Sequence, residues 1–350
     1  MSLLVYGSYG YTGSLIAREA TDRGLSVTLA GRNPDRLREQ SKAVDRPFES
    51  VSLDETNRLE HVVADHDAVL HCAGPFSETA KPMVEACLAA GTDYLDITGE
   101  FGVLEAIADR DEAAEDAGVT LLPAVGFDVV PSDCLAAHLA DRFPSANHLA
   151  LAIAVEGGPS QGTAKTAIEH LDGGGVVRWG GDLVSVPPAW RTRRIDFGDD
   201  VGTKAAVTIP WGDVATAFHS TGIQNVEVYA AAPPRGIRFI RATRHLGPVL
   251  GASPVKRTLR WLVDKIVSGP DAHERKRGRA TLWGEASLGD ERVVSRLTTP
   301  ETYAFTVDSA TTVAERVLAG DVGPGFQTPS TALGADFVLD LEGVERVDVA

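Results

Sequence analysis

Cysteine is scarce in this sequence of 350 residues, and long apolar runs are missing from it. The three cysteines, Cys72, Cys87 and Cys134, are an odd number without metal-ligand spacing, which favours reduced core residues over a disulfide framework. No run approaches the roughly 18 apolar residues of a membrane span. No basic and apolar leader precedes the first strand pattern. We therefore expect a cytoplasmic protein.

Lysine is also scarce, because seven lysines stand among 33 basic residues, against 49 acidic ones. The formal net charge is −16. An acidic, lysine-poor surface fits solubility in a salt-rich cytoplasm, so a halophilic source is one interpretation. This charge argues against nucleic acid as the main partner. The nine histidines are scattered, so we expect no metal site and expect His71 to be a core or cleft residue.

Strand-like and helix-like patterns alternate over about the first 125 residues. The strand patterns lie at 2–6, 25–31, 47–53, 67–72, 93–98 and 118–125. Apolar strands alternating with helices predict an α/β fold with a Rossmann-type doubly wound parallel sheet. Beyond it, alternating runs and glycine-rich loops predict a second α+β domain with a mostly antiparallel sheet. We predict domains at 1–130 and 131–324, the second for substrate binding or dimerisation, with 325–350 able to pack back on the first.

The stretch "YGSYGYTG" is the candidate phosphate loop. Its three glycines, at every third position, follow a buried strand and open a helix. Glycines let the backbone approach a pyrophosphate, and the helix N-terminus favours its negative charge. A plain structural turn is the alternative. The expected cofactor-binding residues of the loop are Gly7, Ser8, Tyr9, Gly10, Tyr11, Thr12 and Gly13.

The end of the second strand indicates which dinucleotide is bound. An NAD enzyme carries Asp or Glu here for the ribose 2′-hydroxyl, whereas this chain has "AGRN" at 30–33. No carboxylate repels a 2′-phosphate, and Arg32 can bind one through its planar guanidinium. We therefore predict that the cofactor is NADP(H) and that Arg32 contacts its 2′-phosphate. The alternative is that Arg32 is a solvated loop residue without a role in binding.

Several stretches together resemble the saccharopine dehydrogenase-like oxidoreductases. They are "YGSYGYTG", "AGRNPDRL", "HCAGPF", "YLDITGE" and "GFDVVPSD". Later stretches, among them "GGPSQGTAKT", "LWGEA" and "GFQTPSTALGADFVL", are similar to the branch that contains the trans-acting enoyl reductases. The resemblance implies a Rossmann domain, a second domain with substrate contacts, and NADP(H)-dependent reduction.

Two further loops follow strands of the predicted parallel sheet, at the edge where ligands bind. The first adds Ala73, Gly74, Pro75 and Phe76 to the expected cofactor contacts, with a Gly-Pro turn as the alternative. The second is "YLDITGE", which the resemblance places on the nicotinamide side and which adds Thr98. Its Tyr94, Asp96 and Glu100 are the candidate catalytic proton donors. Buried hydrogen-bonding residues are the alternative for all three.

We expect an NADP(H)-dependent oxidoreductase that reduces a C=C or C=O bond of a small-molecule, apolar or lipid-like substrate. One alternative is an amino-acid dehydrogenase acting on a saccharopine-type imine, for which Arg178, Arg191 and Arg193 could hold carboxylates. The other alternative is a non-catalytic protein that senses NADP(H).

Residues 235–279 are strongly basic, unlike the rest of the chain. They predict amphipathic helices that could lie on an anionic membrane or receive an acidic carrier protein. The alternative is packing on the second domain or on another subunit of a homodimer.

Overall fold

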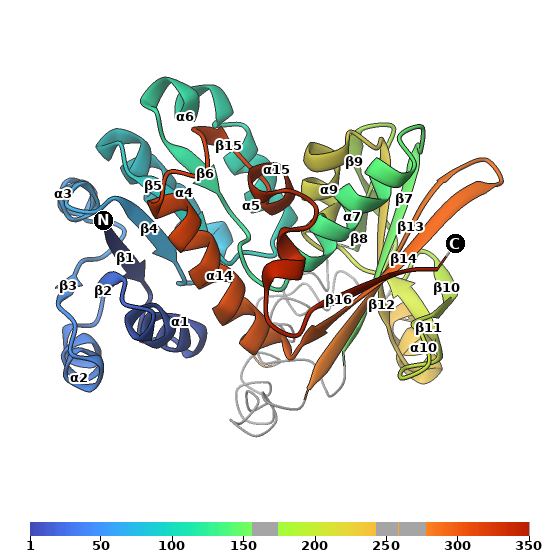
Figure 1. The fold of residues 1–350 in the computed structure, drawn as a ribbon, viewed down its shortest axis with the longest axis horizontal. Helices are drawn as coiled ribbons and strands as arrows, with labels where there is room; N and C mark the ends of the chain where they lie inside the picture. The colour runs from blue at the N-terminus through green and yellow to red at the C-terminus, as the bar shows by residue number, and fades with distance from the viewer. Residues whose placement is uncertain (156–173, 243–257, 259–277, 350) are drawn as a thin grey trace. The chain divides into compact units, whose positions relative to one another are not determined.

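The computed structural model describes residues 1–155, 174–242, 258 and 278–349. The chain divides into two compact units (Figure 1). Unit 1 contains Met1–Cys134 and Tyr303–Glu342, and unit 2 contains Leu135–Thr302 and Gly343–Ala350. The predicted α/β class with two sheets is confirmed. Each unit is described separately.

Unit 1 is built on a seven-stranded parallel sheet in the order β15-β6-β5-β4-β1-β2-β3. Its strands are β1 (Ser2–Tyr6), β2 (Ser26–Gly31), β3 (Phe48–Ser50), β4 (Ala68–His71), β5 (Asp93–Asp96), β6 (Thr120–Leu122) and β15 (Gly325–Phe326). The order reverses between β1 and β4, as in a doubly wound sheet. The Rossmann-type prediction is therefore confirmed, with an added edge strand from near the C-terminus.

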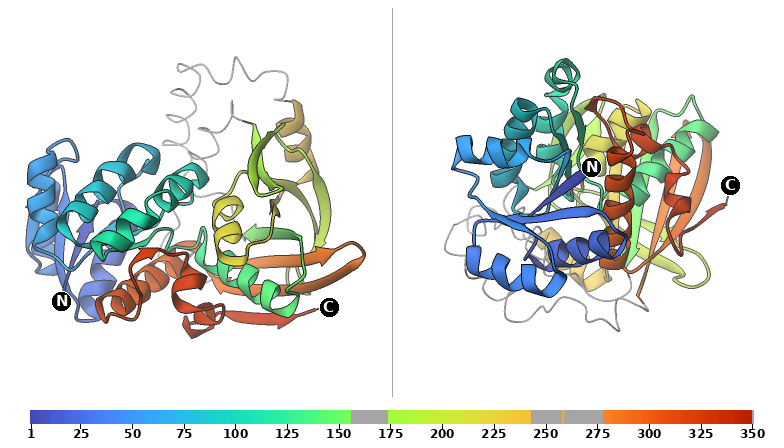
Figure 2. Two further views of the ribbon diagram at one scale, coloured as in Figure 1. Left: turned by 90° about the horizontal axis from the view of Figure 1, so that it is seen from above. Right: turned by 60° about the vertical axis from the view of Figure 1, so that its left-hand side comes forward.

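Helices cover this sheet and bury its apolar strands (Figures 1 and 2). They are α1 (Tyr11–Asp22), α2 (Pro34–Val44), α3 (Thr56–Ala64), α4 (Phe76–Ala90), α5 (Phe101–Ala108), α6 (Asp111–Ala117), α14 (Thr302–Leu318) and α15 (Pro329–Leu333), followed by the short 3-10 helix η2 (Phe337–Asp340). Local sequence signals set the start of α2, because the Asn33 side chain accepts hydrogen bonds from the Asp35 and Arg36 amides.

The unit boundaries differ from the predicted ones at the C-terminal end. Helix α14 was expected in the second domain, but most of it packs in unit 1. The Arg23 guanidinium donates to Asp308 at 2.6 Å, and the Ser309 hydroxyl donates to the Val125 carbonyl at 2.8 Å. Within 325–350, β15 extends the parallel sheet, whereas β16 (Glu345–Asp348) pairs with unit 2. These long-range contacts leave no local sequence signal.

Unit 2 is built on a mixed nine-stranded sheet in the order β10-β11-β12-β7-β13-β14-β16, with β8 beside β12 and β9 beside β8. The further strands are β7 (His148–Val155), β8 (Gly175–Trp179), β9 (Asp182–Val186), β10 (Thr192–Asp196), β11 (Thr203–Thr208), β12 (Asn225–Ala231), β13 (Arg279–Leu288) and β14 (Glu291–Pro300). Only the β7–β12 pairing is parallel among the described strands of this sheet.

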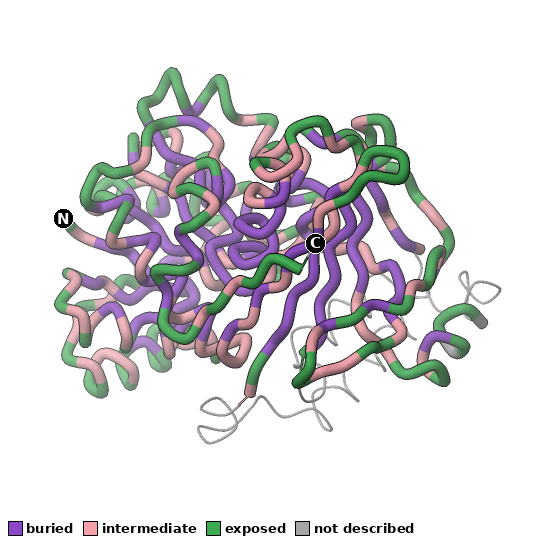
Figure 3. The backbone as a smooth tube through the Cα atoms, turned by 45° about the vertical axis from the view of Figure 1, so that its right-hand side comes forward, coloured by how far each residue is buried: buried purple, intermediate pink, exposed green. Residues whose placement is uncertain are grey.

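Buried positions continue along the central strands of the sheet in unit 2 (Figure 3). Helix α7 (Val130–Arg142) packs closely on one face of this sheet. Its Leu139 side chain lies so near Gly284 of β13 that a Cβ there would be only 2.5 Å away. Helix α9 (Asp213–Thr221) packs beside β8 and β12. The unit therefore has a core of its own.

Helix α10 (Pro234–Ala242) is the described part of the basic segment. Its Ile237 is buried against Ala189 and Val207, while Arg235, Arg238 and Arg241 are exposed. This helix therefore packs internally through its apolar side. Most of the remaining basic segment, residues 243–257 and 259–277, lies outside the described residues. Among the helices that the structure describes, none has the length and apolar character to span a membrane.

Candidate cofactor site

The Gly7–Gly13 loop brings backbone to the carboxyl end of β1. Gly7 has a φ of +79°, and a Cβ there would lie 2.8 Å from the Ala73 Cβ. A Cβ at Gly13 would overlap the Gly7 carbonyl oxygen, which also accepts a hydrogen bond from the Gly10 amide at 2.9 Å. Gly7 and Gly13 thus occupy places where a side chain would force the loop open.

Helix α1 begins directly after this loop. Gly10 is its N-cap residue, and no side chain caps the helix. The first amides of a helix have no partner within it and carry its positive dipole. The amide end of α1 could therefore accept a phosphate group, and phosphate binding by this loop stays a prediction.

Side-chain contacts of the loop hold it in place. The Ser8 hydroxyl donates to Gln40 Oε1, and Gln40 Nε2 donates back to the Ser8 carbonyl, both at 2.8 Å. Ser8 is fully buried, so its hydroxyl fastens the loop to α2. Tyr9 lies on the backbone of Gly31, where a Cβ would be 2.6 Å from the tyrosine ring. The Tyr11 ring packs edge-on against Tyr303 at 4.8 Å.

Two arginines lie where β2 meets α2. Arg32 is exposed, directly after β2. Arg36 is also exposed; it stacks over the Tyr9 ring at 4.7 Å and donates to the Tyr9 carbonyl at 2.8 Å. The sequence prediction named Arg32 but missed Arg36, although its position in the first turn of α2 was a usable signal. Arg32 follows the end of β2, the position from which doubly wound enzymes contact the ribose, and Arg36 lies in the first turn of the next helix.

The loop after β4 is fastened by Thr79 and includes a cis bond between Gly74 and Pro75. The Thr79 hydroxyl donates to the Ala73 carbonyl at 2.6 Å. It also lies 3.1 Å from His71 Nε2. His71 is fully buried, and burial lowers its pKa to about 3, so the imidazole stays neutral. His71 is thus a core residue.

Tyr94 and Asp96 form a buried hydrogen-bond network at the end of β5. The Tyr94 hydroxyl donates to Asp96 Oδ2 at 2.7 Å, while Asp96 Oδ1 accepts from the amides of Thr98 at 2.9 Å and Ala124 at 2.8 Å. Both side chains are fully buried. Burial raises the pKa of Asp96 to about 6 and that of Tyr94 well above its usual value. This network joins the ends of β5 and β6.

Glu100 joins the loop after β5 to the loop after β4. Its two carboxylate oxygens accept from the amides of Phe76 at 2.9 Å and Ser77 at 3.0 Å. It thereby caps α4, whose N-terminus favours a negative charge. Thr98 is buried, and its hydroxyl accepts from the Glu100 amide at 3.1 Å. These hydrogen bonds give Glu100 and Thr98 structural roles, and their catalytic and cofactor roles stay predictions.

Asp128 is a candidate that the sequence analysis missed. It lies in the segment after β6, and a Cβ at Gly99 would be 2.7 Å from its Oδ2. The residue is half-buried, and burial raises the pKa of its carboxyl to about 6. Its carboxyl therefore lies against the loop of the other candidate residues. The only sequence signal was its place in "GFDVVPSD".

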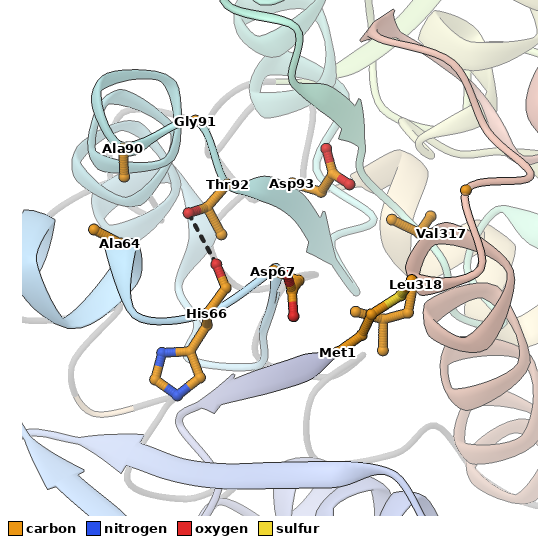
Figure 4. Close-up of a pocket in the computed structure, with 11 residues that line it drawn as sticks. Met1, Ala64, His66, Asp67, Ala90, Gly91, Thr92, Asp93, Val317 and Leu318 are labelled. Carbon is orange, nitrogen blue, oxygen red and sulfur yellow. Dashed lines mark hydrogen bonds between the residues drawn. The ribbon is translucent and has the colours of Figure 1, made fainter.

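A cavity of about 420 Å³ lies at the amino ends of the strands of the same sheet, opposite the carboxyl ends that the candidate cofactor site uses (Figure 4). It is lined at the amino ends of β1, β4 and β5, where Asp67 accepts from the Ser2 amide at 2.6 Å and Asp93 from the Thr120 amide at 2.7 Å. Since ligands of doubly wound sheets bind beyond the carboxyl ends of the strands, this cavity is separate from the candidate cofactor site.

Comparison with known families supports the cofactor assignment. Residues 3–122 match the family described as saccharopine dehydrogenase NADP binding domain. The match begins in β1 and ends in β6, so it contains the glycine loop, both arginines and the loops after β4 and β5.

Curated relatives are similar over part of the chain. A trans-acting enoyl reductase of Mycobacterium ulcerans is 33% identical over 148 residues, which cover 40% of this chain and 35% of the relative. A probable mitochondrial saccharopine dehydrogenase-like oxidoreductase of Arabidopsis thaliana is 32% identical over 148 residues, covering 37% of this chain and 33% of the relative. The matches thus span about a third of each relative.

One solved structure is similar over the whole chain. Apo saccharopine dehydrogenase (L-Glu forming) from Saccharomyces cerevisiae superposes with a TM-score of 0.68 and 14% identity, with 100% of both chains covered. At this identity the likeness concerns the fold alone.

Proposed function

We propose, since residues 3–122 belong to the saccharopine dehydrogenase NADP binding domain family, that the chain is an NADP(H)-dependent oxidoreductase. The reaction is reduction of a C=C or C=O bond in a small, apolar or lipid-like substrate. The observation that carries the proposal is the backbone approach between Gly7 and Ala73 beside the uncapped start of α1. A plain structural turn needs neither feature.

Arg32 and Arg36 account for the phosphate of NADP(H). In this proposal Arg32 forms the bidentate contact with the 2′-phosphate, because it is exposed at the end of β2. Arg36 adds a second positive charge from α2, and its contact with the Tyr9 carbonyl couples this site to the phosphate loop. No carboxylate follows β2 directly, since residues 32 and 33 are Arg and Asn.

The chain positions the reactants and manages a proton, because a nicotinamide supplies the hydride when bound. Asp128 is the proton donor of the proposal: the residue is half-buried, its carboxyl lies against Gly99, and burial raises the carboxyl pKa to about 6. Asp96 and Glu100 fix the positions of the neighbouring loops through their hydrogen bonds to backbone amides. Direct proton transfer from Tyr94, Asp96 or Glu100 stays a prediction.

The proposed substrate class is based on the names of relatives, among them the trans-acting enoyl reductase of Mycobacterium ulcerans. Reduction of an enoyl group needs a hydride at the β-carbon and a proton at the α-carbon. Contact of residues 235–279 with a membrane surface or a carrier protein, a homodimer, and a cytoplasmic, salt-rich setting stay predictions.

NADPH oxidation with a panel of enoyl and keto thioesters tests the proposal. We expect substrate-dependent loss of NADPH absorbance with at least one of them, and weaker activity with NADH. Turnover with imines formed from amino acids and keto acids would favour the amino-acid dehydrogenase. Tight NADPH binding without oxidation across the panel would favour the sensor. Failure to bind NADPH would refute the cofactor assignment itself.

A further inference from the structure

Unit 2 contains a cavity of about 480 Å³, and none of the residues of the proposed cofactor site lines it. Strands β7, β10, β12 and β13 and helix α10 contribute to its lining. Three arginines, Arg191, Arg193 and Arg241, lie around it. Ligand-binding cavities of proteins commonly have volumes of about 300–1,000 Å³, so this one is large enough for a small organic molecule.

Two of these arginines form ion pairs with glutamate side chains that also line the cavity. Arg191 pairs with Glu227 at 2.6 Å, and Arg193 pairs with Glu285 at 2.9 Å. The glutamate side chains are only 9% and 12% exposed, whereas those of Arg191 and Arg193 are 46% and 33% exposed. Each ion pair occupies one guanidinium nitrogen of its arginine, and both arginines line the cavity.

Aromatic rings further restrict the two guanidinium groups. Arg191 stacks over the Trp190 ring at 4.3 Å, and Arg193 lies over the Trp283 ring at 5.0 Å. Stacking and pairing together reduce the side-chain entropy that a ligand contact would otherwise cost. The two groups are therefore preorganised.

Arg241 supplies a charge that the cavity does not balance. Its guanidinium donates to the Thr192 hydroxyl at 3.2 Å and the Ala189 carbonyl at 3.5 Å, which are both neutral. Within the described part of the chain it has no carboxylate partner. Three arginines against two glutamates leave a positive excess in a protein whose net charge is −16.

We propose that this cavity binds a small organic anion through a phosphate or carboxylate group. Guanidinium groups bind both oxyanions through paired, charge-assisted hydrogen bonds. Arg178, which the sequence suggested as a carboxylate partner, lies elsewhere: it is 3% exposed and donates to the carbonyls of Val214 and Gly181, each at 2.7 Å. The site belongs to unit 2 alone and does not depend on the reaction proposed above.

Calorimetric titration of the full chain tests the site, with inorganic phosphate, pyrophosphate, acetate and succinate as probes at constant ionic strength. Saturating NADP⁺ is present, because phosphate would also bind at the Gly7–Gly13 loop. Arg241→Gln is the test variant. Arg238→Gln is its control, because Arg238 is an exposed arginine of the same helix that does not line the cavity.

We expect saturable binding of at least one probe, weakened about tenfold or more by Arg241→Gln and unchanged by Arg238→Gln. The probes that bind identify phosphate or carboxylate as the recognised group. Absence of saturable binding, equal affinity in Arg241→Gln, or equal weakening in both variants would overturn the site. Retained NADP⁺ binding and thermal stability show that the variants are folded. If the wild-type protein does not bind NADP⁺, that result counts against the cofactor assignment and not against the anion site.

Discussion

The backbones of Gly7 and Ala73 are in contact, because a Cβ at residue 7 would lie 2.8 Å from the Ala73 Cβ and 2.8 Å from its amide nitrogen. The two residues follow β1 and β4, the neighbouring strands between which the order of the sheet reverses. The contact closes the base of the candidate cofactor site.

Gly7→Ala is expected to disrupt both the site and the unit. The substitution adds a Cβ at a φ of +79° and pushes it into the loop after β4. We expect a loss of about 2 kcal/mol or more of stability and NADPH binding at least tenfold weaker. Chemical denaturation and NADPH fluorescence measure the two effects. Gly102→Ala is the control, since its Cβ would meet nothing within 4 Å in α5; NADPH affinity equal in both variants would contradict the assignment.

Arg32→Asp is expected to reverse the cofactor preference. The new carboxylate repels a 2′-phosphate and accepts a hydrogen bond from a ribose 2′-hydroxyl. We expect NADPH affinity to fall tenfold to a hundredfold and NADH affinity to rise, measured by fluorescence titration of both. Arg38→Asp, an exposed change in the neighbouring helix α2, should leave the ratio of the two affinities as in the wild type. An unchanged ratio in Arg32→Asp would mean that Arg32 is a solvated loop residue.

Asp96→Ala is expected to destabilise unit 1 by about 2–4 kcal/mol. Removing the carboxylate leaves the amides of Thr98 and Ala124 and the Tyr94 hydroxyl without their buried acceptor. Asp96→Asn keeps one acceptor oxygen and should lose less.

The pH dependence of Asp96→Asn provides a second check. Burial raises the pKa of Asp96 to about 6, above about 3.9 in an unfolded chain. The folded state therefore binds the Asp96 proton more tightly than the unfolded chain does. The stability that this proton contributes is fully present below about pH 4 and is lost as the pH rises to about 6. Denaturation across this range should show the slope in the wild type and a shallower one in Asp96→Asn. Equal slopes would mean that Asp96 titrates normally.

Asp128→Asn tests the proposed proton donor. A general acid acts in its protonated form, and the pKa of Asp128 is raised to about 6, so kcat should fall as pH rises above about 6. We expect the variant to lose about a hundredfold in kcat together with that pH dependence, while NADPH affinity stays unchanged. Asp116→Asn, at an exposed site in α6, serves as control. A variant with wild-type turnover and pH profile would assign the proton to another group.

Glu100→Ala is expected to act mainly through stability. The carboxylate caps α4 through the amides of Phe76 and Ser77, and losing such a cap costs about 1 kcal/mol. Glu100→Gln retains one acceptor and should be less destabilised. Thermal unfolding and kcat are measured together. Loss of turnover in Glu100→Gln at wild-type stability would instead give Glu100 the proton transfer.

Much of unit 1 was predictable because its signals are local. The apolar run at 2–6 became β1, Asn33 capped α2, and the glycine spacing marked the turn between β1 and α1. Each of these depends on neighbours within a few residues, where periodicity and backbone preference act. Residues 3–122, which contain these signals, match an NADP-binding domain family.

The sequence by itself therefore determined the Rossmann-type unit and its cofactor class, while the contacts of individual loops with the cofactor stay predictions. Tertiary structure decided the rest: α14 joins unit 1 through Asp308 and Arg23, the Asp128 carboxyl lies against Gly99, and Arg241 of α10 joins Arg193 of β10 at one cavity. These contacts connect residues distant in the chain. Their side chains carry charge or hydrogen bonds but no periodic pattern, so only packing could bring them together.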